Sequence, residues 1–209
     1  MKRLLIVDGH VVIREGLKAI LQDELEIIFG ETATASEALR LVTEQQWDAV
    51  IIDLSLGERS TFDALREIKQ IRPELPVLIL GPHSNHEYAR RLFAIGVSGY
   101  IAKDSPRAEL VTAVSKVIEG GRYVGSALAE SLVDDMEPRS ENPPHEALSG
   151  REYEVLMLIA SGKTTHDIAN LLSLSDKTVS TYRARILEKM RMKTTVELIH
   201  YAVRNNLVD

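Results

Sequence analysis

Three ionisable residues in the first half of the chain each follow a short apolar run. The runs and the residues after them are Leu4–Val7 with Asp8, Val50–Ile52 with Asp53, and Gly99–Ala102 with Lys103. Two carboxylates beside one ammonium group could accept a phosphoryl group on a carboxylate oxygen and hold the cation that this reaction needs. That chemistry requires the three side chains to meet, although they lie far apart in the sequence.

The apolar runs have the length and flanks of buried strands in a parallel sheet. Amphipathic segments of helix length separate them. A further run, Val77–Leu80, ends at Gly81, and Glu26–Phe29 is another strand candidate. The carboxyl ends of parallel strands line one edge of the sheet, where such proteins place their functional crevice. The three ionisable residues are therefore predicted to converge there.

Strand and helix signals alternate five times over the first 120 residues. This alternation predicts a doubly wound α/β domain with a five-stranded parallel sheet. The helix signals include Ser36 as an N-cap, a stop at Gly96 and Pro106 in the first turn of the fifth helix.

Composition narrows the class of protein. The chain has 209 residues, 44% of them apolar, which suits one large or two small packed domains. It has no cysteine, so disulfides and thiolate metal sites are excluded. No apolar run approaches the ~18 residues of a membrane span. Met1-Lys2-Arg3 leads directly into a strand without the cleavage site of a signal peptide. We expect a cytoplasmic protein with no membrane contact.

The sequence changes character after the fifth strand–helix unit. Residues 121–147 are acidic, and Glu137–Pro144 has the proline-rich composition of a linker. Ala127–Met136 has the pattern of one or two helical turns. We therefore assign residues 1–121 to the α/β domain, 122–146 to a linker and 147–209 to a small all-α domain of four helices.

The third helix of the small domain carries a dense basic cluster. Ser175 is a suitable N-cap for a helix over 176–190, with an apolar stripe formed by Val179, Tyr182, Ile186 and Met190. Within 177–193, six basic residues stand against one acidic residue, Glu188. A short helix at 165–172, a turn of three or four residues and a helix with a basic exposed side form a helix-turn-helix arrangement. Capping-box patterns mark other helix starts, at Ser149–Glu152, Thr164–Asp167 and Thr194–Glu197.

The whole chain outside the linker resembles a two-component response regulator of the NarL/FixJ type. In that family a flavodoxin-like receiver domain precedes a LuxR-type helix-turn-helix domain. The second domain carries the resemblance in residues 148–156 (LSGREYEVL), Ile168-Ala169, residues 175–179 (SDKTV) and Lys189-Met190. The resemblance implies a DNA-binding transcription regulator in a phosphorelay, a sensor histidine kinase as partner and no independent enzymatic activity.

By this resemblance Asp53 is the phosphoacceptor, and Lys103 is the cation that contacts the phosphoryl oxygens. Asp8 and Asp53 are then the candidate ligands for Mg²⁺. Receivers usually carry a second acid directly after the first one, but this chain has Gly9 there. Two carboxylates in place of three predict a weak or absent Mg²⁺ site.

The switch positions of the pocket also depart from the family pattern. Gly81, followed by Pro82, stands where Ser or Thr is usual, so no hydroxyl is available at that position for a phosphoryl oxygen. Tyr100 retains the usual aromatic residue, although its ring could equally belong to the core. Glu58 and Asp104 could provide substitute ligands near the same edge.

Two interpretations of this pocket remain open. In the first, which we favour, Asp53 is phosphorylated slowly with weak metal support. In the second, the domain is a pseudo-receiver controlled by dimerisation, a ligand or a partner protein. A simpler view makes Asp53 only a turn residue at a strand end, but it leaves Asp8 and Lys103 at matching strand ends unexplained.

The resemblance assigns DNA contacts to the third helix of the small domain. Groove-facing positions are Ser180, Thr181 and Ala184; Thr178 lies at the helix start, and candidates for phosphate contacts are Lys177, Arg183, Arg185 and Lys189. Arg185 is the best candidate for a strong contact with guanine. We expect a homodimer on two half-sites of double-stranded DNA, because one domain of this size makes a small interface.

Two further expectations concern the small domain. The last helix could supply part of the dimer contact through Val196, Ile199, His200 and Val203. Without the family pattern, the same four helices could instead form a protein-interaction module whose charged face is simply solvated.

Overall fold

The computed structural model describes residues 1–54, 56, 61–81, 86–125, 143–205 and 207–208. The chain divides into two compact units, residues 1–137 and 138–209. Each unit has its own core. Among the described residues, no helix has both the length and the apolar character needed to cross a membrane.

The first unit is built on a parallel sheet with the strand order β2-β1-β3-β4-β5-β6. The strands are β1 (Lys2–Val7), β2 (Ile27–Thr32), β3 (Ala49–Asp53), β4 (Val77–Gly81), β5 (Gly99–Ala102) and β6 (Tyr123–Val124). Every residue of β3 and β4 is buried, because helices cover both faces of the sheet. The strand order reverses between β1 and β3, which is where doubly wound sheets open a crevice.

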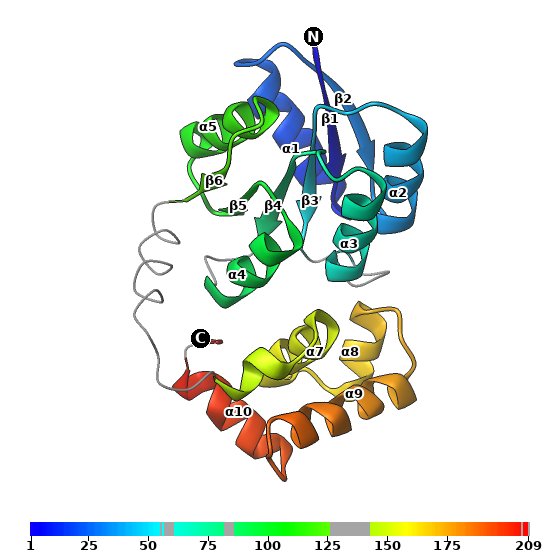
Figure 1. Ribbon diagram of the computed structural model, residues 1–209, viewed down its shortest axis with the longest axis vertical. Coiled ribbons are helices and arrows are strands. Elements are labelled where there is room, and N and C mark those ends of the chain that lie inside the picture. The colour runs from blue at the N-terminus through cyan, green and yellow to red at the C-terminus, as the bar shows by residue number, and fades with distance from the viewer. Residues whose placement is uncertain (55, 57–60, 82–85, 126–142, 206, 209) are drawn as a thin grey trace. The chain divides into compact units, whose positions relative to one another are not determined.

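Among the described residues of this unit, five helices cover the two faces of the sheet (Figure 1). They are α1 (Val11–Gln22), α2 (Ala35–Glu44), α3 (Thr61–Ile71), α4 (His86–Ile95) and α5 (Arg107–Ile118). One core cluster joins α2, α3 and α4 to the sheet, and a second joins α1 and α5 to its other face. The expected stop of α4 at Gly96 is confirmed, since this residue adopts a φ of 99° that favours glycine.

The sheet has six strands, so the prediction of five was one strand short. Residues 123–124 were expected to belong to the linker, but they pair in parallel with Gly99 and Tyr100 of β5. Two residues are too short a run for an apolar pattern to reveal. The predicted helical turns at Ala127–Met136 and the greater part of the linker lie outside the described residues.

Ser36 does not cap α2, contrary to the prediction. Thr34 is the N-cap, and its hydroxyl accepts a hydrogen bond of 3.2 Å from the backbone N–H of Glu37. Both residue types can cap a helix, but Ala35 is buried and lies in the first turn, so the helix begins two residues earlier.

The described residues of the second unit form a 3₁₀ turn and four helices. They are η1 (Pro144–Ala147), α7 (Gly150–Ala160), α8 (Thr165–Leu171), α9 (Asp176–Lys189) and α10 (Thr195–Arg204). Reciprocal capping boxes begin α7 at Ser149 and α8 at Thr164, as predicted. At α10 the box is incomplete, because Glu197 accepts from the N–H of Lys193 rather than that of Thr194.

Four residues, 172–175, separate α8 from α9, and their conformation sets the direction of α9. Ser173 adopts a positive φ of 50°, and the N–H of Leu174 donates to the carbonyl of Ala169. The buried guanidinium of Arg151 on α7 donates to the carbonyl of Leu172 at 3.0 Å. Ser175 then caps α9 by accepting from the N–H of Thr178, as the sequence predicted.

Candidate receiver pocket and nucleic-acid interface

The carboxyl ends of β1, β3 and β5 bring Asp8, Asp53 and Lys103 together, as predicted from the apolar runs. The Lys103 ammonium lies 3.0 Å from Asp53 Oδ2 and 3.4 Å from Asp8 Oδ2. Both aspartates are only 1% exposed, whereas the lysine side chain is 25% exposed. The Lys103 ammonium therefore lies close to both buried carboxylates and reaches them from the solvent side.

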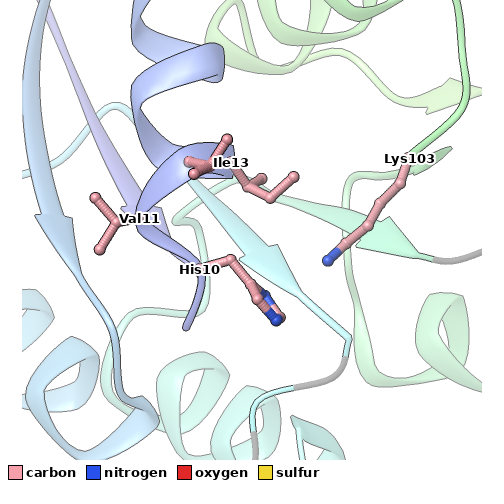
Figure 2. Close-up of a pocket in the computed structure, with 5 residues that line it drawn as sticks. His10, Val11, Ile13 and Lys103 are labelled. Atoms are coloured by element: carbon pink, nitrogen blue, oxygen red, sulfur yellow. The ribbon is translucent and has the colours of Figure 1, made fainter.

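The pocket contains a residue that the sequence analysis did not single out, His10. Its backbone N–H donates to Asp8 Oδ1 at 2.7 Å, and its Nδ1 lies 3.0 Å from the same oxygen. The His10 ring and the Lys103 side chain extend toward the same opening (Figure 2). The sequence could have indicated His10, because this metal-ligating side chain comes directly after Gly9, the position of the missing acid.

The donor set matches Mg²⁺ poorly. Both oxygens of Asp8 already accept contacts, Oδ1 from His10 and Oδ2 from Lys103. Gly9 adds no carboxylate, Asp104 is exposed at the start of the following loop, and Glu58 lies outside the described residues. Mg²⁺ is a hard cation that prefers oxygen ligands in octahedral geometry, and the group of candidate metal ligands among the described residues contains only two carboxylates, Asp8 and Asp53.

The Tyr100 ring occupies the space that a side chain at position 81 would need, near the candidate phosphoacceptor Asp53. A Cβ added at Gly81 would overlap the Tyr100 hydroxyl and ring, so the missing side chain is what lets the ring lie inward. Tyr100 is 1% exposed and belongs to the core cluster of α2, α3 and α4. Burial raises the pKa of its phenol well above the ordinary value, and the charges of Asp104 and Asp53 add to the effect. Pro82 lies outside the described residues.

In the second unit, α9 buries its apolar stripe and turns its basic side outward. Val179, Ile186 and Met190 are buried and Tyr182 is half-buried. The exposed residues on the other side include Lys177, Thr181, Arg183, Ala184 and Arg185, and Ser180 is half-buried at their edge. This division leaves a basic surface with small side chains between the cations.

Two hydroxyls of α9 already take part in hydrogen bonds within the helix. Thr181 Oγ1 donates to the carbonyl of Lys177 at 2.9 Å, and Thr178 Oγ1 lies 2.8 Å from the hydroxyl of the N-cap Ser175. Thr181 is exposed, and its methyl group and the remaining oxygen lone pairs are suited to a base edge.

Lys189 differs from the other basic residues of α9. Its ammonium lies 2.6 Å from Glu152 Oε2 on α7, and the Glu152 side chain is only 5% exposed. Burial by itself raises the pKa of Glu152, but hydrogen bonds from Lys189 and Ser149 outweigh burial and hold this pKa below its ordinary value. Lys189 is thus engaged in fixing α9 to α7.

Both parts of the chain match known protein families. Residues 4–115 match the response regulator receiver domain, and residues 146–202 match the bacterial regulatory proteins of the luxR family. The chain therefore belongs to the two-component response regulators that join a receiver domain to a LuxR-type DNA-binding domain.

Relatives match over the full length of the chain. The response regulator UvrY of Escherichia coli K12 is 30% identical over 211 residues, covering all of this chain and 97% of UvrY. The oxygen regulatory protein NreC of Staphylococcus epidermidis is 36% identical over 218 residues and covers 99% of each chain. RcsB of Salmonella enterica serovar Typhimurium, solved with the promoter rprA and a phosphomimetic, shares the fold. It has a TM-score of 0.67 and 21% identity, and the match covers 96% of this chain and 98% of RcsB.

Proposed function

We propose that this response regulator reads double-stranded DNA with α9 and that Asp53 accepts a phosphoryl group slowly, from a sensor histidine kinase or a small donor. The observation that carries the proposal is the convergence of Asp8, Asp53 and Lys103 at one sheet edge of a chain that also presents a basic α9. We propose no enzymatic activity beyond this self-phosphorylation. We also propose that the protein acts in the cytoplasm, where the chromosome lies.

On α9, the exposed cations and the small side chains would have separate tasks. Lys177, Arg183 and Arg185 form no ion pair with other described residues, so their charge is available to DNA phosphates or to guanine. Ser180, Thr181 and Ala184 would lie against base edges, and Thr178 would approach the backbone at the helix start. Lys189 would support DNA binding mainly by positioning α9 through its ion pair with Glu152, and its other N–H donors could contact a DNA phosphate.

At Asp53, the residues of this chain support acceptance of a phosphoryl group only in part. An Asp53 oxygen would attack phosphorus while the bond to the donor breaks, and Lys103 would compensate charge on the phosphoryl oxygens. The missing acid at Gly9 and the missing hydroxyl at Gly81 remove two usual contributions. We infer slow modification from these two losses.

The second candidate function is a pseudo-receiver that never uses Asp53. The inward Tyr100 favours it, because the ring already fills the space beside Gly81 without any phosphoryl group. In that case dimerisation, a ligand or a partner protein would control DNA binding.

Intact mass after incubation with acetyl phosphate and Mg²⁺ separates the two functions. We expect a single phosphoryl adduct on the full chain that forms slowly and is absent from Asp53→Ala. An adduct that persists in Asp53→Ala would assign the modification elsewhere, and the complete absence of an adduct would favour the pseudo-receiver. A Gly9→Asp variant tests the cause, since restoring the acid should speed adduct formation.

DNA binding has its own test, which is independent of Asp53. Affinity for duplex DNA should fall steeply with salt, and neutralising Lys177 and Arg185 together should reduce that salt dependence. A salt-insensitive affinity, or one unchanged in the double variant, would favour the protein-interaction module instead.

A further inference from the structure

The pocket around Asp8 offers a nitrogen ligand as well as carboxylates. We propose that Asp8, His10 and Asp53 bind a borderline first-row divalent cation, with Zn²⁺ the expected occupant, in preference to Mg²⁺. The inference goes beyond the proposed function, because it requires neither DNA binding nor phosphorylation.

Three ligand atoms from these residues, one per side chain, lie within 4.8 Å of one another. Among the described residues this is the single group of three metal-ligating side chains that meets that limit. The two aspartates are buried at the carboxyl ends of β1 and β3, whereas the His10 side chain is 68% exposed and contacts Asp8 Oδ1 through Nδ1 at 3.0 Å. Two of the three candidate ligands are therefore buried carboxylates, and the third is an exposed imidazole.

The ligand types decide which cation fits. Imidazole nitrogen suits zinc and its neighbours, whereas Mg²⁺ prefers oxygen ligands and retains water. Three protein ligands with a fourth position open to water form a recurrent zinc arrangement. Loss of the acid at Gly9 lowers affinity for a hard cation, while His10 compensates only for a cation that accepts nitrogen.

Two features of the pocket oppose the binding of Zn²⁺. Ligand atoms around tetrahedral zinc stand about 3.3 Å apart, so the observed group must contract as the His10 ring closes. The Lys103 ammonium also lies 3.0 Å from Asp53 Oδ2 and repels an incoming cation. Binding therefore shifts Lys103 toward solvent, where its side chain is already a quarter exposed.

Titration calorimetry on the chelator-treated full chain tests the proposal, with Zn²⁺ and Mg²⁺ added separately. We expect one Zn²⁺ site, with affinity for Mg²⁺ lower by about tenfold or more. His10→Ala should weaken Zn²⁺ binding by about tenfold or more and leave Mg²⁺ binding unchanged. Because His10 is exposed, this variant should melt like the wild type without metal.

His166→Ala provides the matched control, since His166 is a second exposed histidine near an aspartate, with its Nδ1 3.5 Å from Asp176. Its Zn²⁺ affinity should equal that of the wild type. An equal loss in both variants, or no loss in His10→Ala, would overturn the proposal.

A third variant, Gly9→Asp, restores the missing acid at a position where an added Cβ approaches nothing closer than a carbonyl at 4.0 Å. It should raise Mg²⁺ affinity and narrow the preference for Zn²⁺. An unchanged ratio of the two affinities would show that Gly9 does not set the choice of cation, and this part of the proposal would fail. Visible absorption of the Co²⁺ complex supplies an independent readout, because a tetrahedral site with a nitrogen ligand absorbs strongly.

Discussion

Gly81 and Tyr100 show how the loss of one side chain is balanced by another. The ring and hydroxyl of Tyr100 lie where the Cβ of a Ser or Thr at position 81 would need to be. Since protein cores are close-packed, the two positions cannot vary independently. A change that restores the usual hydroxyl must therefore displace the ring.

We predict that Gly81→Ala lowers the free energy of unfolding by about 1–3 kcal/mol, because the new methyl group overpacks the Tyr100 ring. In a Tyr100→Ala background the same change should cost much less, and urea denaturation of the four proteins measures this coupling. Gly16→Ala is the control, since nothing lies within 4 Å of an added Cβ there. Additive effects of the two substitutions would contradict the shared volume.

On the proposed DNA-binding surface of α9, Arg185 is the residue expected to contribute most to affinity. Removing its guanidinium by Arg185→Ala should weaken binding to the cognate site by about 1–3 kcal/mol and relax specificity at one base pair. Fluorescence anisotropy with cognate and scrambled duplexes measures both quantities. Arg204→Ala, at the exposed end of α10, should leave the affinity unchanged. An unaltered affinity in Arg185→Ala would refute the assignment.

Helices α7 and α9 are joined by the ion pair of Glu152 and Lys189. Glu152 has two tasks, because its carboxylate also accepts from the N–H of Ser149 and completes the capping box of α7. The orientation of α9 therefore depends on a charge pair as well as on the apolar stripe. A basic residue at the end of a recognition helix is not automatically a DNA contact.

Replacing Lys189 by methionine removes the ammonium partner of the buried Glu152. We predict a loss of about 1–2 kcal/mol in the free energy of unfolding at neutral pH, since a charge-assisted hydrogen bond is lost and a buried carboxylate is left less well served. Chemical denaturation measures this loss. Lys177→Met, on the exposed side of α9, should change stability little.

The same pair predicts a pH dependence. The pKa of Glu152 in the folded protein lies below its ordinary value of 4.5, so the stabilisation is present above about pH 4.5 and is lost as the pH falls through the lowered pKa. The stability difference between wild type and Lys189→Met should therefore be constant near neutrality and shrink in acid. A difference that grows in acid would contradict the ion pair.

At the scale of the whole molecule, the chain joins a receiver domain to a LuxR-type DNA-binding domain. Helix α10 buries Leu198 and Ala202 against its own unit and leaves Val196 60% and Val203 51% exposed. Exposed apolar residues on one helix are suited to contact with a second copy, and this agrees with the predicted dimer on two half-sites. His200 is exposed on the same helix.

Val203→Asp should weaken dimerisation and reduce binding to a duplex with two half-sites more than binding to a single half-site. Sedimentation analysis and anisotropy measure the two effects. Ile71→Asp places the same charge on an exposed apolar residue of the first unit and should change neither. Equal effects of the two substitutions would locate the dimer contact elsewhere.

Much of the architecture was predictable from local patterns. The strand ends at Asp8 and Asp53, the end of α4 at Gly96 and the caps at Ser149 and Ser175 all follow from apolar period and capping chemistry. β6 was not predicted, because its two residues carry no strand pattern of their own. They form a strand only through their pairing with β5. The choice of Thr34 over Ser36 depended on how α2 packs.

The sequence alone identified the receiver and helix-turn-helix units and the three charged residues of the pocket, because strand ends in a parallel sheet have a defined common edge. Two facts needed the tertiary structure: the Tyr100 ring fills the space beside Gly81, and Glu152 pairs with Lys189. Each depends on the distance between side chains from separate elements or on the direction in which a side chain points, and no periodicity along the chain encodes either quantity.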